Sequence, residues 1–219
     1  MSVRCLSSAL FTVLLGFLFG ACTTGVDPSP HPGVLRVTLR SDDLDTNIVI
    51  LSDTTRFSRY DAFQAWVYGG RIYRGDNYSD LFVNTTISRI ASDTVNLLAR
   101  EWLNGVPINV RDSVAITASN SRYRKYTIFE WVVPPGTYNM LQFSLMASEI
   151  DTYIPKLYIN PLLLPPGVGP QVFFPVSFTV QDDRVTQIDI TIAPFKSLHR
   201  YQDSFLFDRQ MKVAGIQTF

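Results

Sequence analysis

The chain has 219 residues, of which 46% are hydrophobic and 17% charged, and its 19 Lys and Arg balance its 19 Asp and Glu. A formal net charge of zero gives no field that would attract nucleic acid or an acidic substrate, so neither class of partner is expected. Phe and Tyr are abundant and Glu is scarce, a composition that favours strands over helices.

The N-terminus has the pattern of a secretory signal. Arg4 supplies a positive start, residues 6–19 are mostly apolar, and the small residues Gly20 and Ala21 follow. The apolar run is too short to cross a membrane comfortably and polar residues follow it at once, which indicates a cleaved signal rather than a membrane helix.

Phe19-Gly20-Ala21-Cys22 resembles the lipobox of bacterial lipoproteins, although Phe19 stands where that motif usually has Leu. The resemblance implies that Cys22 is acylated, with chains such as palmitate, and becomes the mature N-terminus. Thr23 after the cysteine implies sorting to the outer membrane, by the rule of enteric bacteria. Ordinary signal cleavage, with Cys22 as a spare thiol, is the alternative. Cys5 is the only other cysteine, so we expect no disulfide and no cysteine-based metal or catalytic site in the mature body.

These features divide the sequence into three parts. Residues 1–21 are the predicted signal peptide, and residues 22–33 are the predicted lipidated cysteine with a tether stiffened by Pro28, Pro30 and Pro32. His31 lies in this tether. Residues 34–219 are predicted to form a single β-sandwich domain with an elaborated region around 57–121, a size sufficient for a real core.

The domain begins with a clear strand pattern. In residues 34–40, Leu35, Val37 and Leu39 alternate with polar residues, which predicts a half-buried strand. A polar loop with Asp42, Asp43 and Asp45 follows. The three carboxylates could bind calcium or could belong to a solvated turn, and the spacing matches no EF-hand. The apolar run at 47–51 predicts a central strand.

Residues 63–73 are predicted to form a hairpin, with Gly69-Gly70 as a two-residue turn. Aromatic residues and arginine surround this turn. We take Trp66, Tyr68, Arg71 and Tyr73 as the candidate ligand surface, because aromatic faces beside Arg or Asp can hold a sugar or an extended peptide. The alternative is a hairpin with one buried face and simple aromatic cover on the other.

The middle of the chain is harder to interpret. Residues 81–90 look like a strand. Residues 93–103 could be a short helix capped by Ser92 or Asp93, or a strand at 95–99, and residues 108–116 could be another strand. Residues 119–125 form a polar loop in which Arg122, Arg124 and Lys125 surround Tyr123. A solvated loop or a contact to anionic envelope lipids is favoured there over nucleic acid.

The stretch Pro134-Pro135-Gly136-Thr137-Tyr138 organises the second half. The prolines stop a β-ladder and Gly136 can adopt positive φ, so we expect a hard turn between two strands that form a central hairpin. The predicted inward faces are Thr127, Phe129, Trp131 and Val133 before the turn, and Leu141, Phe143 and Leu145 after it. Tyr138 has the wrong parity for that face and is expected to bond backbone through its hydroxyl, as in a tyrosine corner.

The C-terminal part alternates in the same way. Residues 151–170 contain five prolines and predict a long loop. Residues 176–192 predict a second antiparallel hairpin with its turn at 181–184. A last strand should bury Phe205, Phe207, Met211 and Val213, with a break near Arg209.

The order of these pieces resembles a family of uncharacterised bacterial envelope lipoproteins with transthyretin-like or carboxypeptidase-regulatory-like sandwiches. The likeness lies in residues 133–138, in residues 178–180 with 188–190, and in residues 195–198 leading into 205–207. It implies an all-β fold, an antiparallel Greek-key β-sandwich of the immunoglobulin or transthyretin type. It implies no catalytic residue.

Three functions are compatible with the sequence. No Gly-x-Ser-x-Gly, His-Glu-x-x-His or phosphate-binding glycine loop is present, so no catalytic residue, cofactor or metal is expected. An Asp-based hydrolase is not excluded, but no motif in the sequence supports one. The preferred hypothesis is a membrane-anchored, non-catalytic binding or adhesion module for glycan or protein. The alternative is a structural or accessory subunit of an envelope assembly.

Overall fold

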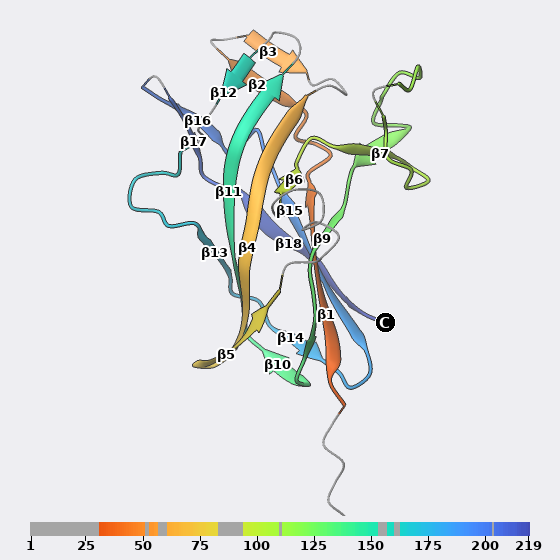
Figure 1. Cartoon of the computed structure of the whole chain (residues 1–219), viewed down its shortest axis with the longest axis vertical. Coiled ribbons are helices and arrows are strands. Elements are labelled where there is room, and N and C mark those ends of the chain that lie inside the picture. Colours follow the sequence, from red (N-terminus) through yellow and green to blue (C-terminus); the bar gives the residue numbers. More distant parts are fainter. Residues whose placement is uncertain are drawn as a thin grey trace, which may run out of the picture. The chain divides into compact units, whose positions relative to one another are not determined.

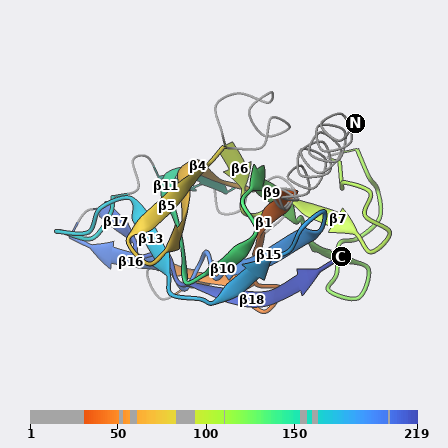
Figure 2. The same ribbon diagram turned by 90° about the horizontal axis from the view of Figure 1, so that it is seen from below.

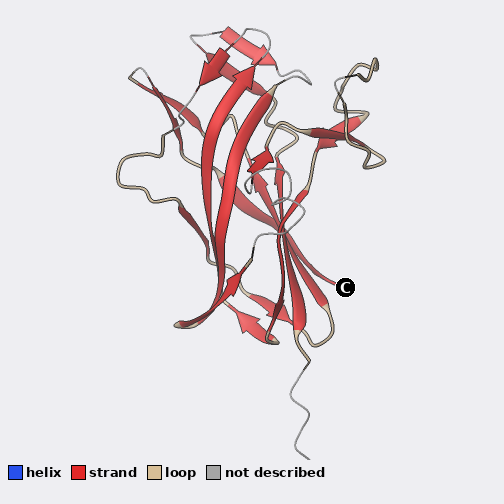
Figure 3. Cartoon of the chain, in the orientation of Figure 1, coloured by secondary structure: helices blue, strands red, loops and turns tan. Residues whose placement is uncertain are grey.

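The computed structural model describes residues 31–50, 53–56, 61–82, 94–109, 111–152, 157–159, 163–202 and 204–219. The chain divides into two compact units, Met1–His31 and Pro32–Phe219, and the second is described here. The described residues form strands, turns and loops but no helix (Figure 3), and therefore no helix able to span a membrane. The all-β prediction is confirmed, while the predicted signal and Cys22 lie outside the described residues.

The first sheet has four strands in the order β18-β15-β1-β9 (Figure 1). Their bounds are Gly33–Ser41 for β1, Tyr126–Val133 for β9, Val185–Ile192 for β15 and Met211–Thr218 for β18. The predicted alternation is confirmed in β1, where Leu35, Val37 and Leu39 are fully buried. The expected antiparallel arrangement is wrong in one place, because β1 and β15 run parallel along their whole length.

The second sheet has six strands built around two long ones, β4 (Ala62–Arg74) and β11 (Met140–Thr152), which pair antiparallel. Short strands extend both sides: β5 (Asn77–Leu81) and β6 (Thr94–Asn96) pair with β4, while β12 (Leu157–Ile159) and β13 (Gln171–Phe174) pair with β11. Leu141, Phe143 and Leu145 of β11 are fully buried, as predicted.

Eight further strands form four small antiparallel pairs. The pairs are β2 (Asn47–Ile50) with β3 (Asp53–Arg56), β7 (Arg100–Trp102) with β8 (Ser121–Tyr123), β10 (Gly136–Tyr138) with β14 (Phe178–Val180), and β16 (Leu198–Tyr201) with β17 (Ser204–Phe207). The predicted central strand at 47–51 is therefore wrong, because β2 pairs with β3. The helix considered at 93–103 is also wrong, since β6 and β7 occupy that range. No described residue of 108–116 lies in a strand.

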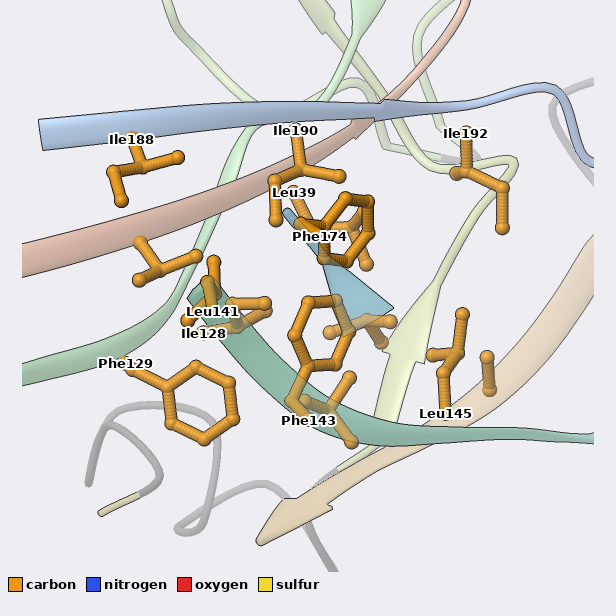
Figure 4. Close-up of a cluster of buried hydrophobic side chains, with 14 of the residues drawn as sticks. Leu39, Ile128, Phe129, Leu141, Phe143, Leu145, Phe174, Ile188, Ile190 and Ile192 are labelled. Carbon is orange, nitrogen blue, oxygen red and sulfur yellow. The ribbon is translucent and has the colours of Figure 1, made fainter. Parts of the chain in front are cut away.

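The two large sheets face each other across one hydrophobic core (Figures 2 and 4). Phe143 of the second sheet lies at its centre, with ring centroids 5.8 Å from Phe129 of the first sheet and 5.5 Å from Phe174. Among the described residues, every fully buried apolar one lies between Leu35 and Phe207. The unit Pro32–Phe219 therefore contains the whole described core and has what a domain needs to fold by itself.

The Pro-Pro-Gly stretch sends the chain from one sheet to the other. The prediction of a central hairpin is wrong, because β9 belongs to the first sheet and β11 to the second. The local predictions hold: Gly136 has φ 139°, and the buried Tyr138 donates its hydroxyl to the Pro134 carbonyl at 2.6 Å. Arg74 closes the same corner, donating to the Pro135 carbonyl at 2.7 Å while its guanidinium lies 5.0 Å from the Tyr138 ring centroid.

The inward face predicted for β9 needs one correction. Phe129 and Val133 are buried, but Thr127 is only half-buried and Trp131 is 45% exposed at this edge strand. A bulge opposite Val37 and Thr38 explains Thr127, because it turns Ile128 into the core in its place. Trp131 keeps the inward parity of Phe129 and Val133 and is exposed at the open edge of the sheet.

The predicted hairpin at 176–192 is also wrong. Its turn forms, with the Arg184 amide donating to the Gln181 carbonyl at 3.4 Å, but β14 pairs with β10 while β15 pairs with β1 and β18. The break predicted near Arg209 is confirmed by its φ of 58°. The buried guanidinium of Arg209 donates to the carbonyls of Leu145, Gly169 and Pro170, and so ties the C-terminal segment to β11.

Candidate functional site

The two glycines that were expected to turn the chain instead form a bulge in β4. Gln142 faces Arg71 and Ser144 faces Tyr68, so Gly69 and Gly70 together oppose a single residue of β11. Gly69 has φ 58°, the conformation that such a bulge requires. The predicted hairpin is therefore wrong, and the real turn comes at Gly75 and Asp76, between β4 and β5. A Gly-Gly pair serves both structures because each needs positive φ.

The bulge decides which way the candidate residues point. Side chains alternate along a strand, so Arg71 and Tyr73 would face the core without the extra residue. With it, Trp66 and Tyr68 before the bulge and Arg71 and Tyr73 after it all face outward, while Phe63, Ala65, Val67 and Ile72 are buried. The structure thus brings the four candidate residues together on one face.

Neighbouring strands enlarge this surface with residues that the sequence did not assign to it. We call it the outer aromatic face and define it as Trp66, Tyr68, Arg71, Tyr73, Tyr78, Gln142, Ser144, Met146 and Phe173. Four of its aromatic side chains are well exposed: Trp66 (44%), Tyr68 (37%), Tyr78 (53%) and Phe173 (55%). Alternation of side chains along Gln171–Phe174 could have predicted that Phe173 faces outward. No sequence pattern predicted that the other added residues lie beside it.

Specific contacts hold one end of the face in place. Arg71 Nε donates to Asp80 Oδ1 at 2.9 Å, and its guanidinium lies 4.5 Å from the Tyr78 ring centroid. The hydrogen bonds to Asp80 and Tyr73 raise the pKa of Arg71 above its ordinary value, so the group stays cationic. Tyr73 donates its hydroxyl to Gln142 Oε1 and its ring centroid lies 5.9 Å from that of Tyr78.

The other end of the face is more apolar. Trp66 lies opposite Met146 across the β4–β11 ladder, and Tyr68 donates its hydroxyl to the Met146 sulfur at 3.2 Å. Gln142 and Ser144 point away from the core, yet they are only 9% and 4% exposed. Bulky neighbours therefore close over these polar groups, and the aromatic side chains form the exposed part of the surface.

The outer face of the first sheet has the opposite character. Arg36 pairs with Glu130 at 2.5 Å, and Asp189 accepts hydrogen bonds from Thr38, Lys125 and Gln187. Burial opposes ionisation of Asp189, but these donors outweigh it and lower its pKa. Val132 is a large exposed apolar residue on this outer face, at the edge strand β9. Trp131 lies opposite the buried Leu35 and therefore belongs to the inner side, where it contacts Phe82 at the sheet edge with ring centroids 4.5 Å apart.

The three aspartates considered for calcium have separate structural partners. Asp45 is buried and accepts the backbone amides of Phe195 and Lys196, and burial raises its pKa. Asp43 accepts the Tyr123 amide and Asp42 accepts the Leu44 amide. Within the described residues, no group of three or more His, Cys, Asp or Glu side chains could hold a metal ion.

The remaining candidates are paired at the surface. His199 lies in β16 and contacts Asp208 through Nε2 at 2.7 Å, with its side chain 52% exposed. In the basic stretch, Arg122 pairs with Glu101 at 2.7 Å and Lys125 with Asp189 at 3.1 Å. The guanidinium of Arg124 lies 5.2 Å from the Tyr126 ring centroid. The polar loop predicted at 119–125 is wrong in part, because residues 121–123 form β8 and pair with β7.

No model of a protein family, no curated protein and no solved structure matches the chain. The lipoprotein family that the sequence resembles therefore stays a prediction. The feature of the described strands that bears on function is the outer aromatic face, where four exposed aromatic side chains lie on one side of the second sheet.

Proposed function

We propose that the chain is a membrane-anchored, non-catalytic binding module that captures a glycan or a protein through its outer aromatic face. In this proposal, acylated Cys22 holds the chain in a bacterial envelope, at the outer membrane, and residues 22–33 form the tether. A Greek-key β-sandwich of the immunoglobulin or transthyretin type is the proposed scaffold. The two large sheets around one core support that fold, and the exposed aromatic residues of the second sheet support the activity.

The contrast between the two outer faces carries the proposal. Paired charges are sufficient for the outer face of a sheet that only contacts water. The first sheet carries such pairs, Arg36–Glu130 and Lys125–Asp189. The second sheet instead exposes Trp, Tyr and Phe side chains from three strands. Contiguous exposed apolar surface on a soluble domain marks interaction sites, and Trp, Tyr and Arg are the side chains that contribute most at interfaces.

The chemistry of the face suits a ligand with apolar faces and polar edges. Exposed rings of Trp66, Tyr68 and Phe173 offer flat apolar area for a sugar ring or an aliphatic side chain. Polar atoms lie beside them: the Tyr68 and Tyr73 hydroxyls, Arg71 and Asp80. Few, well-placed polar groups among apolar ones are typical of ligand sites.

The face is also held in position before any ligand arrives. The Arg71–Asp80 and Tyr73–Gln142 hydrogen bonds fix side chains that would otherwise sample several rotamers. Beneath these side chains lies the ladder between β4 and β11, two strands of 13 residues each. Binding to such a surface loses less side-chain entropy than binding to a mobile loop.

Replacing Trp66, Tyr68 and Tyr73 together by Ala is expected to weaken capture about a hundredfold, because aromatic anchors dominate binding energy. The measurement is binding of Pro32–Phe219 to a glycan array and to solubilised envelope proteins, followed by titration of each hit. The matched control replaces Arg36, Gln187 and Thr191 of the first sheet by Ala. Equal loss in the two triple variants, or full capture by the aromatic one, would refute the proposal. Thermal unfolding of each variant confirms that the fold is kept.

A further inference from the structure

A second exposed feature lies away from the outer aromatic face. We call it the arm and define it as Arg100 to Lys125, which comprises β7, the loop 103–120, β8 and the two residues after β8. Figure 1 shows it in green, projecting to the right of β9. It is described except for residue 110. None of its residues belongs to the outer aromatic face.

The arm is built to keep a fixed shape. The Trp102 amide donates to the Val106 carbonyl at 2.8 Å and the Ile108 amide to the Arg100 carbonyl at 3.1 Å. Farther along, Asn120 Nδ2 donates to the Ala115 carbonyl at 2.8 Å and Ser121 Oγ to the Thr117 carbonyl at 2.7 Å. These bonds hold both halves of the loop in defined turns, so the side chains at its surface are presented in a set arrangement.

Apolar side chains occupy the exposed positions of this loop. Leu103 is 56% exposed, Val106 50% and Val114 58%. A solvated loop of this length usually shows polar residues at such positions, because exposed aliphatic groups are not stabilised by water. Three of them on a preorganised loop indicate a surface that is covered by an apolar phase or partner.

The arm is also the basic part of a neutral chain. Between Arg100 and Lys125 there are five basic residues and two acidic ones, Glu101 and Asp112, which gives 5 − 2 = +3 against a net charge of zero for the whole sequence. Arg111 is exposed in the loop, while Arg100 and Arg124 stack on Tyr123 and Tyr126 near its base. The nearby Asp43 is compensated by Arg40 at 3.7 Å, whereas Asp189 pairs with Lys125 at 3.1 Å and reduces the charge at the arm to 3 − 1 = +2.

We propose that the arm docks on an anionic lipid bilayer, with Leu103, Val106 and Val114 inserted at the interface and the arginines against the headgroups. Exposed aliphatic side chains and nearby cations supply the two terms that drive interfacial binding. The contact does not depend on acylation of Cys22 or on the outer aromatic face. It would give an anchored chain a second membrane contact and so limit the orientations of the domain.

The first test compares two triple variants of Pro32–Phe219. Leu103→Ser, Val106→Ser and Val114→Ser remove the apolar side chains of the arm. Leu163→Ser, Val132→Ser and Val168→Ser change the same residue types at positions 44%, 53% and 45% exposed elsewhere. Sedimentation with vesicles of about one-third phosphatidylglycerol in phosphatidylcholine should show affinity reduced about tenfold or more in the arm variant alone. Equal binding by the two variants, or no binding by the wild type, overturns the proposal.

The second test reports insertion directly. Pro32–Phe219 contains no cysteine, so Val114→Cys or Val168→Cys gives one site for an environment-sensitive fluorophore. A blue shift on the mixed vesicles at position 114 and not at 168 supports insertion. Binding should fall as ionic strength rises from about 0.05 to about 0.5 M and on pure phosphatidylcholine, because screening removes the electrostatic attraction. The absence of a shift at position 114, or an equal shift at 168, contradicts the proposed docking. An arm that binds a protein instead of lipid would give no shift at position 114 on vesicles.

Discussion

Ending the chain before Phe205 is expected to abolish folding of Pro32–Phe219. The deletion removes Phe207, which is fully buried and packs edge-on against Phe63 with ring centroids 5.3 Å apart. It also removes β18, the partner of β15, and the Arg209 guanidinium that binds three carbonyls. Each buried apolar side chain contributes about 1.5–3 kcal/mol, whereas a whole domain is stable by about 5–15 kcal/mol.

The measurement is urea unfolding followed by circular dichroism. Deleting Phe219 alone is the control, because its side chain is 57% exposed. That variant should unfold cooperatively near the wild-type midpoint. A soluble protein that lacks residues 205–219 and still shows a cooperative transition would mean that the C-terminal strand is an accessory to the fold.

Replacing Gly136 by Ala is expected to destabilise the domain by about 2–4 kcal/mol, for two separate reasons. Its φ of 139° lies in a region that residues with a Cβ avoid. A Cβ at this position would also meet the Arg74 guanidinium, with Nη2 at 2.0 Å. The clash would break the Arg74–Pro135 hydrogen bond that closes the corner between the two large sheets.

A comparison of variants separates the two reasons. Gly75→Ala is the matched control, since Gly75 has φ 60° and a Cβ there would meet nothing within 4 Å. It should cost about 1 kcal/mol. Arg74→Ala combined with Gly136→Ala should be less destabilising than the sum of the single changes, because the clash disappears. Additive free energies of unfolding would show that Arg74 does not restrict this corner.

Side-chain periodicity predicted the faces of the main strands well. Leu35, Val37 and Leu39, like Ile188, Ile190 and Ile192, are buried as their alternation indicates. Alternation is a local property of an extended chain, so it does not depend on which strand pairs with the segment. The same holds for Tyr138, whose hydroxyl finds a carbonyl four residues away.

Strand partners could not be predicted in the same way. Pro134-Pro135 and the turn at 181–184 mark where the chain bends, but each is followed by a strand that pairs elsewhere. The parallel contact of β1 with β15 joins residues about 150 positions apart, as Thr38 and Asp189 do. The residues of a turn determine only where the chain bends. Which strands pair depends on contacts between segments far apart in sequence.

The sequence predicted four residues of the candidate site correctly, but it did not predict how the strands bring them together. Trp66, Tyr68, Arg71 and Tyr73 share one face, yet they do so because Gly69 and Gly70 form a bulge rather than a turn. Phe173, Gln142 and Tyr78 join them through the registers of β13, β11 and β5. Those registers cannot be obtained from the spacing within any one segment.

The most direct test of the outer aromatic face is site-specific photocrosslinking in the intact chain. A benzophenone side chain would replace Phe173, which is 55% exposed, or Gln187 on the outer face of the first sheet. We expect covalent adducts with the captured glycan or protein from position 173 alone, and their loss when Tyr68 and Tyr73 are replaced by Ala. Adducts formed equally from position 187, or unchanged by those substitutions, would contradict the assignment of this face as the binding surface.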